Sequence, residues 1–119
     1  MRDDRERLQD IVQAIRQILS KTGAGRALFE ADEMVQVWAL HHLQVVGEAA
    51  RCLSPEFKQR YPDDTWSKAA GMRHILVHHY FEIDADQAWR VIELDLPALL
   101  ARVTQILGTN LESSTSVQN

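Results

Sequence analysis

A cluster of ionisable side chains between residues 73 and 80 carries the strongest chemical signal in this chain. Arg73, three histidines (His74, His78 and His79) and Tyr80 fall within eight positions, at the end of a mostly apolar run. An arginine is charged at any biological pH and suits the oxygens of a phosphate. An imidazole can both take up and release a proton near neutral pH. Together these groups suit chemistry at a phosphodiester bond.

Two long amphipathic helices are predicted in the first half of the chain, where apolar residues recur at three- and four-residue steps. The first begins near Asp3 and Asp4 and stops at Gly23. The second runs from residues 30–32 to about residue 53, and Gly47 inside it indicates close packing against another helix. The expected apolar stripes are Leu8, Ile11, Val12, Ile15, Ile18 and Leu19 in the first helix, and Met34, Val35, Trp38, His42, Val45, Val46 and Ala49 in the second.

Three further helices are predicted after residue 53. Ser54 and Pro55 should open a short helix that stops before residue 62. A helix capped by residue 64 or 65 should then carry the ionisable cluster. Asp84 should cap a last long helix to about residue 107, in which Pro97 causes a kink or a restart with Asp95 as a possible second cap.

The fold class that follows is all-α, a compact antiparallel bundle of four to five helices. Its single domain should span residues 1–107, and the Ser-, Thr- and Asn-rich segment 108–119 is expected to be a disordered tail. No apolar run is long enough for a membrane span, and a single cysteine, Cys52, fits a reducing compartment. We therefore expect a cytoplasmic protein. The net charge of −4 argues against a general nucleic-acid binder but not against a local cationic site.

The spacing of Arg73 and His78 leaves their relation open. On a continuous helix five residues span about 140° of rotation, so the two side chains would not share one narrow face. They could converge if the helix ends near His78, or if a second subunit completes the site. In the alternative interpretation, Arg73 pairs with a carboxylate and His78 only stabilises a helix C-terminus.

Several neighbouring side chains also have two interpretations. His74 and His78 have the four-residue spacing of a helical zinc pair, but the sequence suggests no third ligand, so no metal is expected. Glu48 is either on a solvated helix face or a buried partner that orients Arg73 or a histidine. His42 fits a core or interface position better than a catalytic one. Tyr80 lies past the expected helix end, where its hydroxyl could be exposed in the same cleft.

Taken as a set, these residues resemble the HepT-like HEPN-domain proteins, ribonuclease toxins that are paired with minimal nucleotidyltransferase antitoxins. The hallmark of that family is Arg, four residues, His, one residue, Tyr, and Arg73, His78 and Tyr80 fall on it. The resemblance extends over roughly residues 3 to 107. It includes the segments Gly47-Glu48-Ala49-Ala50, Leu53-Ser54, Tyr61-Pro62 with Trp66, Ile83-Asp84 and Asp95-Leu96-Pro97.

The resemblance implies a metal-independent endoribonuclease that needs no cofactor and acts as a homodimer or higher oligomer, with its two hallmark segments facing each other. In that picture His78 transfers protons, Arg73 holds the scissile phosphate of the RNA, and His74 positions a phosphate oxygen. A nucleotidyltransferase partner would block the cleft by transferring AMP to Tyr80.

The chain departs from the family pattern at two positions. His74 stands where relatives often have Asn, and His79 stands where a residue that is often acidic separates the histidine from the tyrosine. His79 therefore offers an alternative catalytic histidine. The rival class is a non-catalytic helical module that binds a nucleotide or docks the nucleotidyltransferase.

Overall fold

The computed structural model describes the backbone of residues 3–75, 77–78 and 82–108, and side chains within 3–75 and 84–108. Apart from one pairing of two-residue strands, the fold within these ranges is all-α, as predicted. Its elements are α1 (Asp4–Thr22), α2 (Arg26–Ala31), α3 (Glu33–Arg51), α4 (Pro55–Arg60), α5 (Thr65–Gly71), the 3-10 helix η1 (Met72–His74), β1 (Val77–His78), β2 (Glu82–Ile83), α6 (Ala85–Arg90), the π-helix η2 (Val91–Asp95) and α7 (Leu96–Ile106).

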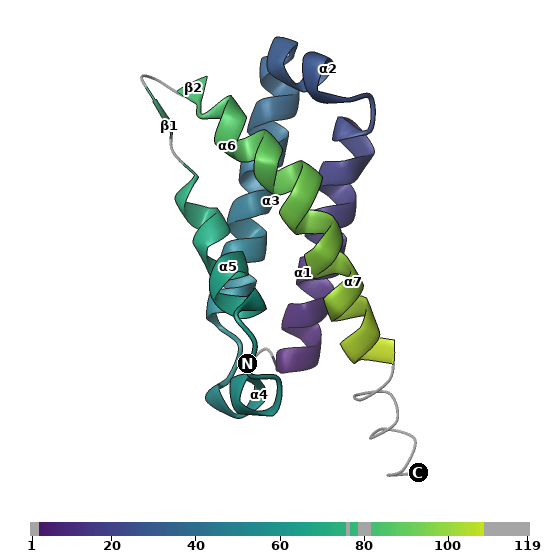
Figure 1. Ribbon diagram of the computed structural model, residues 1–119, viewed down its shortest axis with the longest axis vertical. Helices are drawn as coiled ribbons and strands as arrows, with labels where there is room; N and C mark the ends of the chain where they lie inside the picture. The colour runs from purple at the N-terminus through teal and green to yellow at the C-terminus, as the bar shows by residue number, and fades with distance from the viewer. Residues whose placement is uncertain (1–2, 76, 79–81, 109–119) are drawn as a thin grey trace.

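The bundle is organised around α3. Helix α1 packs antiparallel along α3, and α5 and η1 contact the same helix (Figure 1). Helices α6, η2 and α7 form one long rod that crosses α1, while α2 closes the end of the bundle against α6. The prediction of four to five helices therefore holds for the main bundle. The short helix α2, between α1 and α3, was not predicted.

Side-chain caps fix most helix starts where the sequence predicts them. Asp3 accepts a hydrogen bond from the backbone N–H of Glu6, and Ser54 and Asp84 cap α4 and α6 in the same way. Asp32 caps α3 through two backbone N–H groups. Each such cap satisfies helix donors that otherwise have no partner.

The rod near Pro97 continues instead of breaking. Pro97 lies in the first turn of α7, directly after the π-helical turn Val91–Asp95. Because proline has no N–H to donate, a wider turn before it lets the helix continue without that bond. Asp95 makes no side-chain cap there, so its predicted role as a second cap is wrong.

The core matches the predicted stripe in α1, but in α3 it includes only Val46 and Ala49 of that stripe. Leu8, Ile11, Ile15 and Ile18 are fully buried. In α3 the buried face consists of Ala39, Leu43, Val46, Gly47, Ala49 and Ala50, whereas Met34 is 76% exposed. Alanine and glycine bury little area and give a weak pattern, but they let neighbouring helices approach closely, so the contact face lies to one side of the predicted stripe.

The expected boundary between domain and tail at residue 108 stays a prediction, because residues 109–119 lie outside the described ranges. Among the described helices, none combines the length and the apolar character that a membrane crossing requires.

Candidate functional site

Gly47 on α3 brings Arg73 into the bundle. A Cβ atom at position 47 would lie 2.7 Å from the Cβ of Arg73 and 2.8 Å from its backbone nitrogen. The carbonyl oxygen of Ala70 would be 3.1 Å away. Only a residue without a side chain leaves room for this approach, which confirms the close packing predicted from Gly47. The backbone of Arg73 is thereby fixed directly against the middle of α3.

The guanidinium of Arg73 reaches Glu48, the residue after this glycine. Arg73 Nη1 lies 3.7 Å from Glu48 Oε1, and the side chain of Arg73 keeps 38% of its area exposed. Glu48 itself is 54% exposed, so it lies on a solvated helix face, the first of its two interpretations, and it still pairs with Arg73 as in the second. An arginine held at one side but open to solvent can still bind a second anion.

Glu48 also binds the end of its own helix. Arg51 Nη2 donates to Glu48 Oε2 at 2.5 Å, and the Cys52 thiol lies 3.5 Å from the same oxygen. The hydrogen bond from Arg51, then that from Cys52 and the charges of Arg51 and Arg73, lower the pKa of Glu48 to about 2. The carboxylate is therefore ionised at physiological pH and holds two arginines on one side of α3.

The helix that carries the ionisable cluster ends earlier than expected. Helix α5 stops at Gly71, η1 ends at His74, and Ile75 has extended backbone. His78 lies in β1, where it pairs with Glu82 of β2. The predicted continuation of a helix through His78 is therefore wrong, and the 140° helical rotation between Arg73 and His78 does not apply.

The same change removes the helical zinc spacing. His74 is exposed at the end of η1, whereas His78 is in an extended strand, so the two histidines do not occupy successive turns of one helix. In the part of the chain that the structure describes, no three His, Cys, Asp or Glu side chains are grouped to hold a metal ion.

Three of the predicted site residues are described only in part or not at all. His79 and Tyr80 lie outside the described residues, and His78 is described by its backbone alone. The structure brings together Arg73 and Glu48, and places His74 next to Arg73 in η1. The relation of His78 and Tyr80 to Arg73 stays a prediction.

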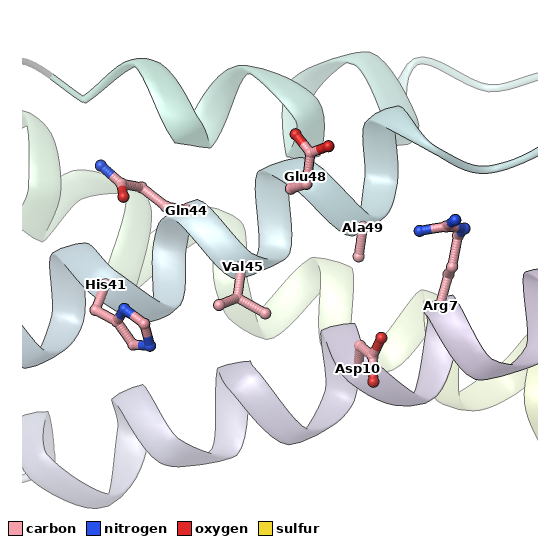
Figure 2. A pocket seen from close by; sticks show the side chains of 7 residues that line it. All are labelled: Arg7, Asp10, His41, Gln44, Val45, Glu48 and Ala49. Carbon is pink, nitrogen blue, oxygen red and sulfur yellow. The ribbon is translucent and has the colours of Figure 1, made fainter. Parts of the chain in front are cut away.

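His41 and His42 form a separate group on α3. His42 is half-buried and packs edge-on against Trp38, with 4.6 Å between the centroids of the two rings. This agrees with its predicted packing role. Partial burial, and secondly the neighbouring His41, lower the pKa of His42. His41 is exposed and projects from α3 toward the groove beside α1 (Figure 2).

A pocket of about 340 Å³ opens between α1 and α3 beside Glu48. Figure 2 shows Val45 and Ala49 facing the space between the two helices, with His41 at one end and Arg7 at the other. Asp10 joins Arg7 on the α1 side, and the remaining lining residues are Gln44 and Glu48. The pocket thus has an apolar base and a polar rim.

Comparisons of the sequence with known proteins identify its family. A family model described as ribonuclease HepT-like matches residues 10–106. The chain belongs to the HepT-like ribonuclease family. It is similar to a Thermococcus cleftensis protein named "Probable ribonuclease HepT", with 30% identity over 108 residues that cover 88% of this chain and 96% of the relative.

A second relative, "Putative RNase MJ1380" of Methanocaldococcus jannaschii, is 28% identical over 103 residues, which cover 86% of this chain and 94% of that protein. No solved structure gives a significant match. The matched region therefore contains Arg73 and the lining residues of the pocket except Arg7. Both relatives align with this chain over more than nine-tenths of their own length.

Sequence reasoning missed several residues of this HepT-like site. Arg51 could have been found from its three-residue spacing to Glu48, which places the two on one helix face. Arg7 and Asp10 gave no such signal, because only the packing of α1 on α3 brings them to the pocket.

Proposed function

We propose that this HepT-like protein is a metal-independent endoribonuclease in which Arg73 binds the scissile phosphate and His78 transfers a proton. The observation that carries the proposal is that Arg73 has a fixed backbone and an exposed side chain. Its backbone is packed against Gly47, yet its side chain is 38% exposed, and among the described residues its one ion pair is the 3.7 Å contact with Glu48. Such a group is oriented in advance and still has donors to offer to a phosphate.

The chemistry follows from what each group can donate. His78 would take the proton from the ribose 2′-hydroxyl or give one to the leaving oxygen. Arg73 would offset negative charge on the equatorial oxygens of the phosphate, and exposed His74 next to it would position one of those oxygens. Glu48 would keep the guanidinium of Arg73 in place. None of these steps requires a metal ion.

Loss of either main group should nearly abolish cleavage of an RNA substrate. Positioned acid–base catalysis is worth about 10²–10⁴-fold, so Arg73→Ala and His78→Ala should each reduce the rate by about that range, and EDTA should leave the wild-type rate unchanged. The exposed Arg16→Ala on α1 is the matched control and should cleave normally. Gel analysis of labelled RNA measures all of these rates.

Three results would point elsewhere. Cleavage that disappears with EDTA and returns with a divalent metal would contradict the mechanism. A fully active His78→Ala with an inactive His79→Ala would assign the proton transfer to His79. Wild-type protein that binds RNA but never cuts it would favour the non-catalytic module, in which the same surface serves for docking.

We further propose that the protein is the toxin of a two-component module in the cytoplasm, controlled by AMP transfer to Tyr80. Tyr80 comes two residues after His78, so an AMP group on its hydroxyl would place a phosphate beside the site and occupy Arg73. A nucleotidyltransferase with ATP would be the partner.

Intact-mass measurement after incubation with that partner, ATP and Mg²⁺ tests this control. Wild-type protein should gain the mass of AMP and lose its ribonuclease activity. Tyr80→Phe should gain no mass and should keep cutting RNA in the presence of the partner. An equal mass gain on Tyr80→Phe would show that the acceptor is another residue.

A further inference from the structure

The pocket between α1 and α3 lies next to the proposed phosphate site but differs from it in chemistry. Its base is made by Val45 and Ala49, and two planar groups flank it, the imidazole of His41 and the guanidinium of Arg7 (Figure 2). RNA-binding proteins commonly stack unpaired bases on histidine rings and arginine planes. The flanks of this pocket therefore offer the surfaces that a flat heterocycle requires.

The rim of the pocket is suited to a base edge and unsuited to a phosphate. Gln44 carries an amide that both donates and accepts hydrogen bonds, and Asp10 brings a carboxylate that accepts them. Carboxylates repel anions, and Glu48 adds a second carboxylate at the border of the pocket. A neutral ligand with donors on its edge is favoured over a phosphate or a sulfate.

Glu48 connects this pocket to Arg73. The same side chain lines the pocket and lies 3.7 Å from the guanidinium of Arg73. A phosphate bound at Arg73 would therefore leave an attached nucleotide beside the mouth of the pocket. The base site at His41 and Gln44 lies on α3. The carboxylate of Glu48, on the same helix, lies next to the phosphate site that Arg73 of η1 provides.

We propose that the pocket is a nucleobase subsite, which holds one unpaired base of the RNA next to the scissile bond. This inference rests on the proposed ribonuclease function and names a part of its substrate site. In the bound state the base lies on Val45 and Ala49 and stacks on the imidazole of His41, and its edge forms hydrogen bonds with Gln44 and Asp10.

Binding of two half-ligands to the full-length, ¹⁵N-labelled wild-type protein tests the proposal. Adenosine has a base without a phosphate, and ribose 5-phosphate has a phosphate without a base. Adenosine should shift the backbone amide signals of residues 41–45, whereas ribose 5-phosphate should leave these signals unchanged and shift those of Gly47, Glu48 and Arg73, at the proposed phosphate site. Gln44→Ala and His41→Ala should each weaken adenosine binding about fivefold, the loss expected for one net hydrogen bond or stacking contact.

Both substituted positions are exposed on α3, so the variants should fold, and an unchanged amide spectrum outside the pocket verifies this. Gln9→Ala, an exposed glutamine on α1 that does not line this pocket, is the matched control and should bind adenosine normally. An unaltered adenosine affinity in both pocket variants would overturn the proposal. Shifts at residues 41–45 that follow protein concentration without nucleoside would also overturn it, because they would make this face a contact between copies.

RNA cleavage by the same wild-type sample separates this inference from the function on which it rests. RNA cleavage without adenosine binding would remove the subsite and leave the ribonuclease. Adenosine binding in the pocket without any RNA cleavage would support a nucleoside site and contradict the ribonuclease.

Discussion

Glu48 has a larger structural role than its exposed position suggests. One carboxylate accepts from Arg51 at 2.5 Å, lies near the Cys52 thiol and faces Arg73 at 3.7 Å. Arg51 closes the last turn of α3, while Arg73 belongs to η1. The charge of Glu48 therefore joins a helix end to the element that carries the phosphate-binding candidate.

Replacing Glu48 by glutamine should change how stability depends on pH. The pKa of Glu48 in the folded protein is about 2, below its ordinary value of 4.5. A carboxylate whose pKa is lowered by folding stabilises the folded state above about pH 4.5, and this stabilisation is lost as the pH falls toward 2. Wild type should therefore have a higher melting temperature than Glu48→Gln at pH 7, and the difference should shrink as the pH falls from 4.5.

The measurement is a series of thermal unfolding curves for both proteins between pH 7 and pH 3. Glu93→Gln, an exposed carboxylate on η2, is the comparison variant and should show no such trend. The effect should be small, because the side chain is exposed and solvent screens its ion pairs. A constant difference across the series would mean that Glu48 does not act through its charge.

Individual site residues differed in how well the sequence revealed them. Arg73 and Glu48 were found because charged side chains stand out in apolar helical runs. Arg51 and Cys52 were missed although both lie within the predicted helix, because helical spacing alone does not show which of several neighbouring side chains Glu48 binds. Arg7 and His41 come from different helices, and the sequence contains no pattern that pairs them.

At the scale of the elements, the contact between α3 and η1 depends on one missing side chain. Gly47→Ala would place a Cβ 2.7 Å from Arg73 Cβ and 2.8 Å from the Arg73 backbone nitrogen. Backbone cannot move aside as a flexible side chain can, so η1 must shift away from α3. We expect a loss of stability of about 1–3 kcal/mol, typical of overpacking, together with reduced RNA cleavage.

Gly71→Ala is the matched control for this prediction. Among the residues that the structure describes, none has an atom within 4 Å of a Cβ at position 71, and the backbone there is helical, with φ of −67°. Alanine should therefore be tolerated and should raise stability by about 0.4–1 kcal/mol, because it restricts the unfolded chain. Chemical denaturation compares the two variants. Equal stabilities of the two variants would contradict the prediction, because they would show that an added Cβ at position 47 does not destabilise the contact between α3 and η1.

The sequence predicted the elements whose boundaries are marked by side-chain chemistry. The predicted caps at Ser54 and Asp84 were correct because a short polar side chain binds the free N–H groups of a helix start, and the start predicted near Asp3 was also correct. The turn from η1 into β1 was not predicted, because its two-residue pairing, Val77 with Ile83 and His78 with Glu82, shows no alternation in the sequence. The π-turn before Pro97 was anticipated only as a kink.

At the scale of the whole molecule, the bundle leaves several apolar side chains at its surface. Met34 is 76% exposed, Leu94 60%, Leu28 46% and Val37 45%. Met34 and Val37 both lie on α3, the helix that also holds Gly47 and Glu48. Isolated exposed apolar residues are common, but two on the helix that carries the candidate site fit the expectation of a homodimer, and we propose that a second copy covers part of this surface.

The dimer proposal has a specific form because Arg73 and His78 lie in different elements. Arg73 is fixed on α3 through η1, whereas His78 follows in β1 after the chain has become extended. We expect each active site to combine Arg73 of one subunit with His78 of the other. The wild-type chain should then sediment as a dimer, with twice the monomer mass of 13.6 kDa, at micromolar concentration.

Mixing two inactive variants tests this arrangement directly. In a dimer of one Arg73→Ala and one His78→Ala chain, one composite site has lost both groups and the other keeps both. Random exchange makes about half of the dimers mixed, each with one of two sites intact, so an equal mixture should recover about a quarter of the wild-type cleavage rate per dimer. Each variant alone should stay inactive. Two samples of Arg73→Ala mixed and exchanged in the same way control for the mixing itself. If the exchanged mixture recovers no activity although mixed dimers are present by native mass measurement, both groups of a site belong to the same subunit.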